Sequence, residues 1–435
     1  MNSILKPISA ISLVMAGLLT TGNVLAKTQV IHAGELLTIP GKKPLQKQTL
    51  VVENNKIIAI KKGFVDHKQF AKDAELIDLS SSFVMPGLFD MHVHLQMELG
   101  PNNDSENLRM SDADKLIASV NFSNKILMSG FTTVRDLGGT SEESFALRDG
   151  VKKGLIDGPN IIAAGHMVAA TGGHGDVDGM NPEILKIKTA ETICDGPYDC
   201  RRATRQAIKY GADVIKITST GGVLSDTDTG TGQQMADDEL KEIVDAAHAL
   251  GRKVTSHAHA AAGINAALRA GVDSIEHGSY ADKESIKLFK KNGAYLVPTL
   301  LAGDTVVNMA KTSDFMSPAI KAKAIRVGAD MITNFKRSYK AGVKIAFGTD
   351  SGVSNHGINA REAVLMHQAG MPSADILKSA TVNAADLANM SKTHGTLEVG
   401  KVADIIATDG SALKNIEELL DVDFVMKSGK VVKQQ

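Results

Sequence analysis

The sequence predicts an α/β fold, a TIM-type (β/α)8 barrel with a small β-sandwich domain built from both chain ends. Three observations indicate this fold. Between residues 83 and 352, eight apolar strand-like runs alternate with helical stretches, a pattern typical of a parallel sheet. Both chain ends carry short strand-like runs separated by turns. Charged residues and histidines gather at the carboxyl ends of the apolar runs, where such barrels hold their active sites.

The amino-terminal stretch, residues 1–26, is predicted to be a signal peptide. Lys6 precedes an apolar run over residues 8–19, and Val24-Leu25-Ala26 resembles a cleavage site. We expect cleavage after Ala26 and export, with the protein periplasmic or secreted. The alternative is an uncleaved membrane anchor. The run is short for a membrane span, so no stable membrane anchor is expected.

Residues 27–84 and 396–435 are predicted to form the small β domain together. The first segment contains "TLVVENNKIIAI" and "AELIDLS", with Asn54-Asn55 as a hairpin-like break. The second contains "GKVADIIATDG" and "VDFVMKSGKVVKQQ", which have the same strand-like character. Two such segments at opposite ends of a chain can pair into one sheet.

Residues 85–395 are predicted to form the barrel, with the first strand starting just before this boundary. Helical patterns between the strands end at glycine, as helix carboxyl termini often do; residues 237–251 and 261–271 are examples. The eight strand-like runs cover residues 83–95, 131–138, 160–166, 211–219, 252–259, 272–278, 294–300 and 343–352.

Composition excludes several classes of function. The net charge is 48 − 49 = −1, so the chain lacks the basic surface of a nucleic-acid-binding protein. Aromatic residues make up only 4% and tryptophan is absent, which argues against stacking on single-stranded nucleic acid. The two cysteines, Cys194 and Cys200, flank a turn-forming "DGPYD" segment, and export permits a disulfide. We predict a local disulfide between them.

Polar side chains end most of the predicted barrel strands. His92 and His94 lie two residues apart, so a strand aims both imidazoles at one face, as a metal ion requires. Polar residues of other strands should converge on the same end of the barrel. They are Arg135 and Asp136, His166, Lys216, His257, His277 and Asp350.

Lys216 stands out because Ile215 and Ile217 flank it within a predicted strand. Burial lowers the pKa of a lysine, and a neutral amine can react with carbon dioxide to give a carbamate. The carbamate offers two oxygens that can bridge two metal ions. The alternative is an ion pair between Lys216 and Asp213 or another carboxylate.

The motifs "PGLFDMHVHL", "GADVIKI", "SHAH", "DSIEHG" and "FGTDSG", in that order, resemble the amidohydrolase superfamily. The closing "GTLEVGKVADII" fits the same family, and the likeness is nearest to its binuclear Xaa-Pro dipeptidase and carboxypeptidase branch. The resemblance implies two divalent metal ions, for which a His-rich site suits zinc. It implies that His92 and His94 bind one ion, that His257 and His277 bind the other, that carboxylated Lys216 bridges them, and that Asp350 is a ligand that also transfers protons.

The resemblance also implies residues that contact substrate: His166, His174, His259, Tyr280, Arg135 and His356. In "SHAH" we choose His257 rather than His259 as the metal ligand. Arg135 suits a substrate carboxylate, and the alternative is a structural ion pair with Asp136 or a neighbour.

The expected activity is hydrolysis of the amide bond of dipeptides or short peptides, with a metal-bridging water activated for attack on the carbonyl. The alternatives are an amidase acting on N-acyl amino acids, cyclic amides, lactones or xenobiotic amides, and an inactive metal-binding barrel. Deamination is disfavoured, because mononuclear deaminases of the superfamily typically lack the lysine found here at Lys216 and carry a glutamate shortly after the histidine that matches His257. We expect a small-molecule partner, no nucleic acid and, as a family expectation only, a homo-oligomer.

Overall fold

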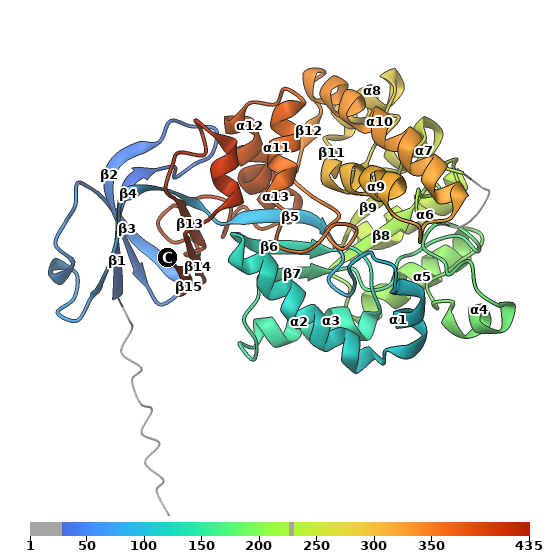
Figure 1. Ribbon diagram of the computed structural model, residues 1–435, viewed down its shortest axis with the longest axis horizontal. Helices are drawn as coiled ribbons and strands as arrows, with labels where there is room; N and C mark the ends of the chain where they lie inside the picture. Colours follow the sequence, from blue (N-terminus) through green and yellow to red (C-terminus); the bar gives the residue numbers. More distant parts are fainter. Residues whose placement is uncertain (1–27, 226–229) are drawn as a thin grey trace, which may run out of the picture.

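The computed structural model describes residues 28–225 and 230–435, so the predicted signal peptide lies outside the described residues. Its strands form a seven-stranded mixed sheet, a five-stranded sheet and a three-stranded sheet (Figure 1). The five-stranded and three-stranded sheets are parallel throughout. The predicted α/β class is therefore confirmed.

The mixed sheet unites the two ends of the chain. Its order is β15-β14-β13-β4-β1-β2-β3. The long strand β4 pairs parallel with β1 on one side and antiparallel with β13 on the other, which joins the two halves. The strands are β1 Thr28–Leu36, β2 Leu45–Glu53, β3 Lys56–Lys62, β4 Glu75–Pro86, β13 Ile405–Thr408, β14 Phe424–Lys427 and β15 Lys430–Gln434.

These strands form one continuous sheet, where we predicted a sandwich. An isolated bridge between Lys56 and Val402 connects the start of the edge strand β3 to the residues before β13, so the sheet curls back on itself. Side chains from both chain ends then share one buried apolar cluster, which includes Leu50, Ile57 and Phe424. Curling therefore buries the apolar face without a second sheet.

Eight short parallel strands make up the other two sheets, and each lies within one of the eight predicted runs. Their order is β5-β6-β7 in one sheet and β12-β11-β10-β9-β8 in the other. Single bridges link the two sheets at both sides, from Val93 to Ser351 and from Val168 to Ile217. The strands are β5 Leu88–Val93, β6 Phe131–Asp136, β7 Asn160–Ala163, β8 Val214–Thr218, β9 Lys253–Ala258, β10 Ser274–His277, β11 Tyr295–Val297 and β12 Lys344–Ile345.

Helices surround the parallel strands, which explains why these strands are buried on both faces (Figure 1). The predicted helices at 237–251 and 261–271 correspond to α6 and α7. None of the helices in the described ranges is long and apolar enough to cross a membrane. The α-helices are α1 Asn103–Arg109, α2 Asp112–Met128, α3 Ser141–Lys152, α4 Pro182–Lys188, α5 Pro197–Tyr210, α6 Asp237–Ala249, α7 Ala261–Ala270, α8 Lys283–Asn292, α9 Leu300–Thr312, α10 Pro318–Lys340, α11 Arg361–Gln368, α12 Ser373–Lys378 and α13 Ala384–Leu387.

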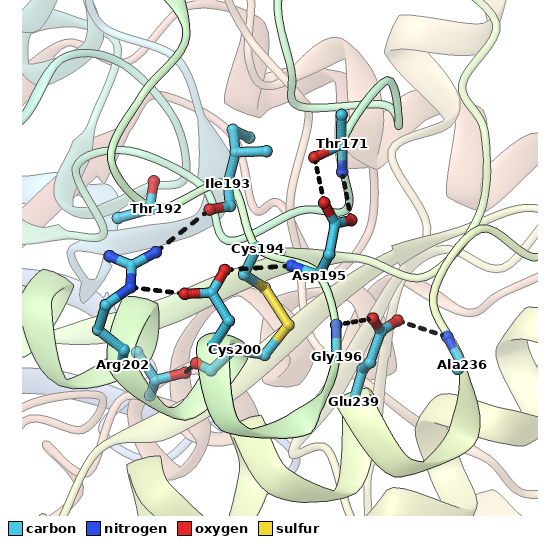
Figure 2. The surroundings of a disulfide bond; sticks show 12 residues. Thr171, Thr192, Ile193, Cys194, Asp195, Gly196, Cys200, Arg202, Ala236 and Glu239 are labelled. Atoms are coloured by element: carbon cyan, nitrogen blue, oxygen red, sulfur yellow. Dashed lines mark hydrogen bonds and ion pairs between the residues drawn. A yellow bond between two sulfur atoms is a disulfide. The ribbon is translucent and has the colours of Figure 1, made fainter.

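The predicted disulfide between Cys194 and Cys200 is present, with the Cα atoms 5.0 Å apart (Figure 2). The bridge joins Cys194, which precedes α5, to Cys200 inside this helix, whose first turn begins at Pro197. The backbone N–H of Cys194 donates to the Ala169 carbonyl at 2.9 Å. The disulfide thus fixes the start of α5 against the segment that follows β7.

Candidate metal centre and substrate pocket

His92, His94 and Asp350 meet at the carboxyl end of β5. His92 Nε2 and His94 Nε2 lie 3.3 Å apart, and Asp350 Oδ1 lies 3.4 Å from the first and 3.2 Å from the second. The ligand atoms of the three residues all lie within 4.8 Å of one another. One metal ion fits such a group of two imidazole nitrogens and a carboxylate oxygen.

Hydrogen bonds fix which nitrogen each histidine turns to this centre. His92 Nδ1 donates to Glu276 Oε2 at 2.9 Å, and His94 Nδ1 donates to the Gly138 carbonyl at 3.1 Å. His277 Nδ1 lies 2.7 Å from the Thr299 hydroxyl, which itself donates to the Pro298 carbonyl and so accepts from the imidazole. In all three rings Nε2 keeps its lone pair, as metal binding requires.

Asp350 is held in a conformation that few aspartates adopt. Its φ is 59°, and its backbone N–H donates to the His92 carbonyl at 2.7 Å. Its buried Oδ1 makes no hydrogen bond to the described part of the chain. Burial opposes ionisation, but the neighbouring imidazoles of His92 and His94 hold the pKa of the Asp350 carboxyl far below its ordinary value. The carboxylate is therefore ionised and free to accept a cation.

Lys216 reaches the same centre from β8. Its Nζ lies 3.4 Å from His92 Nε2, and burial lowers its pKa to about 8. The alternative ion pair with Asp213 is absent, because Asp213 pairs with Arg148 at 2.9 Å. Within the described ranges, Lys216 forms no ion pair with any carboxylate. The Lys216 amine therefore lies beside a candidate metal ligand without a carboxylate partner.

Four more imidazoles continue the site beyond this centre. The ring centroids of His257 and His277 are 4.6 Å apart, and His277 stands 5.3 Å from His92. His259 and His174 pack against His257 at 4.7 and 4.2 Å. Burial, together with the neighbouring imidazoles, lowers the pKa of His257 and His277 well below the usual range. These rings are neutral and offer nitrogen ligands.

A cavity of about 580 Å³ opens over these residues. Its floor is the cluster of His92, His94, Lys216, His257, His277 and Asp350. Three of the predicted substrate residues, His166, His174 and His259, also line it. Much of the remaining wall is apolar and includes Met97, Leu99, Met180, Val306, Val327 and Met331. A pocket of this size and composition suits a small, partly apolar molecule.

Residues 83–432 match the model of the amidohydrolase family. This chain belongs to the amidohydrolase family. Ochratoxinase from Aspergillus niger is 32% identical over 429 residues, covering 94% of this chain and 87% of that protein. A solved Xaa-Pro dipeptidase with bound methionine in the active site is 38% identical, with a TM-score of 0.88 over 94% of this chain and 100% of that one. A solved prolidase complexed with N-methylphosphonate-L-proline is 31% identical, with a TM-score of 0.83 over 94% and 100%.

In this amidohydrolase Arg135 does not face substrate, contrary to one prediction. It is 2% exposed, and its Nη2 pairs with Glu276 Oε1 at 2.9 Å while its Nε donates to the Met91 carbonyl at 2.7 Å. Arg135 therefore pairs with the carboxylate that holds His92. Burial alone would raise the pKa of Glu276, but the Arg135 guanidinium and His92 lower it to about 2. The alternative of a structural ion pair is correct, with Glu276 rather than Asp136 as the partner.

Tyr280 and His356 also lie outside the residues that line the cavity. His356 Nε2 donates to the His94 carbonyl at 3.1 Å, its Nδ1 lies 3.0 Å from Glu98, and its ring stacks on Phe122 at 4.5 Å. His356 therefore holds the backbone at His94 in place through this hydrogen bond. Tyr280 is half-buried, and its backbone N–H donates to the His259 carbonyl at 3.0 Å. The predicted contacts of both side chains with substrate therefore stay predictions.

Sequence reasoning missed two carboxylates that orient the amidohydrolase centre. Glu276 accepts the hydrogen bond from His92 Nδ1 and so fixes the orientation of that ring. Asp90 accepts hydrogen bonds from the backbone N–H groups of His92 and Thr349, at 3.1 and 3.0 Å, and from Asn359 Nδ2 at 2.8 Å. Asp90 thereby ties β5 to the segment that carries Asp350. Their positions, directly before His277 and two residues before His92, were a usable signal, because residues inside parallel strands are otherwise apolar.

Proposed function

We propose that this protein is a metal-dependent hydrolase that cleaves the amide bond of dipeptides or short peptides. The observation that carries the proposal is the group of His92, His94 and Asp350, with Lys216 beside it, on the floor of a cavity of about 580 Å³. The similar Xaa-Pro dipeptidase and prolidase support a peptide substrate. The apolar wall supports an apolar side chain next to the scissile bond.

The residues present fit a pair of divalent ions. His92, His94 and Asp350 would hold the first, His257 and His277 would hold the second, and Lys216 as its carbamate would bridge them. The free Nε2 lone pairs and the unsatisfied Asp350 Oδ1 support this assignment, and nitrogen-rich donors with carboxylate-type oxygens suit zinc. Such ions, when bound, lower the pKa of water and polarise an amide carbonyl.

The chain's own residues would then manage protons and orientation. Asp350 would take the proton of the attacking water and pass it to the leaving nitrogen. His166, His174 and His259 line the cavity beside the centre and would orient the substrate by hydrogen bonds. The buried Glu276 keeps His92 in the tautomer that presents Nε2.

We also propose that the eight parallel strands close into a barrel, and that the protein is exported. The Val93–Ser351 and Val168–Ile217 bridges, one at each side, support closure. The Cys194–Cys200 disulfide supports an oxidising compartment. The apolar segment over residues 8–19 supports a signal peptide with cleavage after Ala26.

The test is a screen of dipeptides and N-acyl amino acids with the mature, zinc-loaded protein, read by mass spectrometry. We expect release of free amino acids that a chelator abolishes and added zinc restores. The control is the zinc-loaded Asp350→Asn protein, which should release them about 10²- to 10⁴-fold more slowly. Absence of release from every member, with metal bound, would refute peptide hydrolysis and favour cyclic amides or xenobiotic amides.

A further inference from the structure

Glu143 is a buried carboxylate in the wall of the cavity that has no role in the metal centre. It lies in the first turn of α3, where its backbone N–H donates to the Thr140 hydroxyl at 3.3 Å. The residue is only 3% exposed and lines the cavity. Its Oε1 is buried and has no hydrogen-bond partner in the described ranges.

Gln96 adds a second unsatisfied acceptor to the same wall. Its Nε2 donates to Asp136 Oδ2 at 2.9 Å and to the Ser144 hydroxyl at 3.1 Å, which fixes the orientation of the amide. Its Oε1 is left buried without a partner among the described residues, and Gln96 also lines the cavity. Because Ser144 follows Glu143 directly in α3, the hydrogen bond to Ser144 holds the Gln96 side chain against the first turn of this helix.

Two buried acceptors without donors are costly, and a charged donor offsets that cost. Burial raises the pKa of Glu143, and the nearby carboxylates of Asp112 and Glu142 raise it further. Lys115, which also lines the cavity, is the basic side chain that opposes this effect, and no ion pair joins it to Glu143 within the described ranges. The wall is therefore suited to a cationic group that arrives with the substrate.

We propose that Glu143, assisted by Gln96, binds a primary ammonium group of the substrate. The inference rests on the proposed function and deepens it: the substrate is a peptide with a free amine, not an N-acyl amino acid. The ammonium comes either from the amino terminus or from a lysine side chain. The apolar wall, which includes Met97 and Met180, favours an apolar first residue and hence the terminal amine.

The experiment compares a leucyl dipeptide, its N-acetyl derivative and an N-acetyl-lysyl dipeptide with the zinc-loaded protein. With the wild type, N-acetylation of the leucyl substrate should raise KM about 10- to 100-fold, the value of a charged hydrogen bond, with a smaller change in kcat. Glu143→Gln should raise KM for the free leucyl dipeptide by a similar factor. It should leave the kinetics of the N-acetyl-leucyl substrate unchanged.

Glu142→Gln is the matched control, because Glu142 is the exposed neighbour on the same helix turn. It should leave the preference for the free amine intact. Glu143→Asp, which keeps the charge, should retain part of the preference, and this separates recognition of charge from a packing role. Thermal unfolding of each variant checks that the fold is retained.

Each outcome decides the proposal. A low KM for the N-acetyl-lysyl substrate that depends on Glu143 would support the ammonium site and assign it to the side chain. Equal KM values for the free and N-acetyl substrates, unchanged by Glu143→Gln, would overturn the ammonium site while amide hydrolysis stands. No hydrolysis of any substrate by the wild type would overturn the proposed function itself, and the ammonium site with it.

Discussion

At the scale of single residues, the site is built on unfavourable backbone conformations. His277, Thr299 and Asp350 adopt φ values of 68°, 50° and 59°, in the left-handed region that side chains other than glycine rarely occupy. Hydrogen bonds hold them there, including the contact between His277 and Thr299. Strain of this kind costs of order 1–3 kcal/mol per residue and is typical of functional sites.

The role of Asp350 makes a direct prediction. Asp350→Asn should lower kcat by about 10²- to 10⁴-fold, since the amide cannot accept the proton of the attacking water. The fold should survive, because the anchoring bond from the Asp350 backbone N–H to the His92 carbonyl does not involve the side chain. Steady-state kinetics with parallel metal analysis would check this. A variant with bound metal and normal kcat would contradict the proton-transfer role.

Glu276 offers a second prediction. Glu276→Gln removes the charge that orients His92, so metal affinity should fall about 10- to 100-fold. It also leaves Arg135 buried without a counter-charge, so the unfolding free energy should fall by about 3–5 kcal/mol. Chelator competition and denaturant unfolding measure the two effects. If both values matched those of the exposed-site variant Glu142→Gln, Glu276 would have no such role.

At the scale of elements, the sequence predicted the strands better than the directions of their side chains. Buried parallel strands are continuous apolar runs, so all eight were recognisable. The last run, residues 343–352, contains only the two-residue strand β12. The residues that follow it, up to Asp350, have no regular secondary structure. The substrate contacts of His356 and Tyr280 stay predictions, because a position after a strand does not determine which way a side chain turns.

The disulfide is an element-scale feature with a measurable effect. The double variant Cys194→Ala, Cys200→Ala should lose about 2 kcal/mol of unfolding free energy, because the bridge closes a short loop in the unfolded chain. Denaturant unfolding of oxidised wild type and variant would give the difference. The reduced wild type should resemble the variant. Equal stability of all three would indicate that contacts such as the Cys194–Ala169 hydrogen bond fix α5 without the bridge.

At the scale of the whole molecule, the convergence of the site was predictable and its pocket was not. Carboxyl ends of parallel strands meet at one edge, so His92, Lys216 and His277 had to lie near one another. Glu143 was not identified, because an acidic residue in the first turn of a helix is ordinarily explained by the helix dipole. Its burial depends on how α3 packs over the cavity, which no local pattern reports.

A long-range ion pair gives the last prediction, on the pH dependence of overall stability. His248 of α6 lies 2.9 Å from Asp273 Oδ2, and the hydrogen bond to Asp273 raises the pKa of His248 above its ordinary 6.5. Asp273 also accepts the backbone N–H of Val254 in β9, and its carbonyl accepts that of Tyr295 in β11. The pair therefore connects helix α6 with strands β9 and β11.

A raised histidine pKa means that the folded state binds the proton more tightly than the unfolded state. The stabilisation is complete below pH 6.5 and is lost as the pH rises through the higher pKa of the folded state. His248→Gln should therefore lower the unfolding free energy more at about pH 5.5 than at about pH 8.5, by less than about 1 kcal/mol because the pair is partly exposed. Denaturant unfolding of both proteins at the two pH values measures this. An equal loss at both would mean that His248 contributes by packing, and a larger loss at the higher pH would reverse the sign of the linkage.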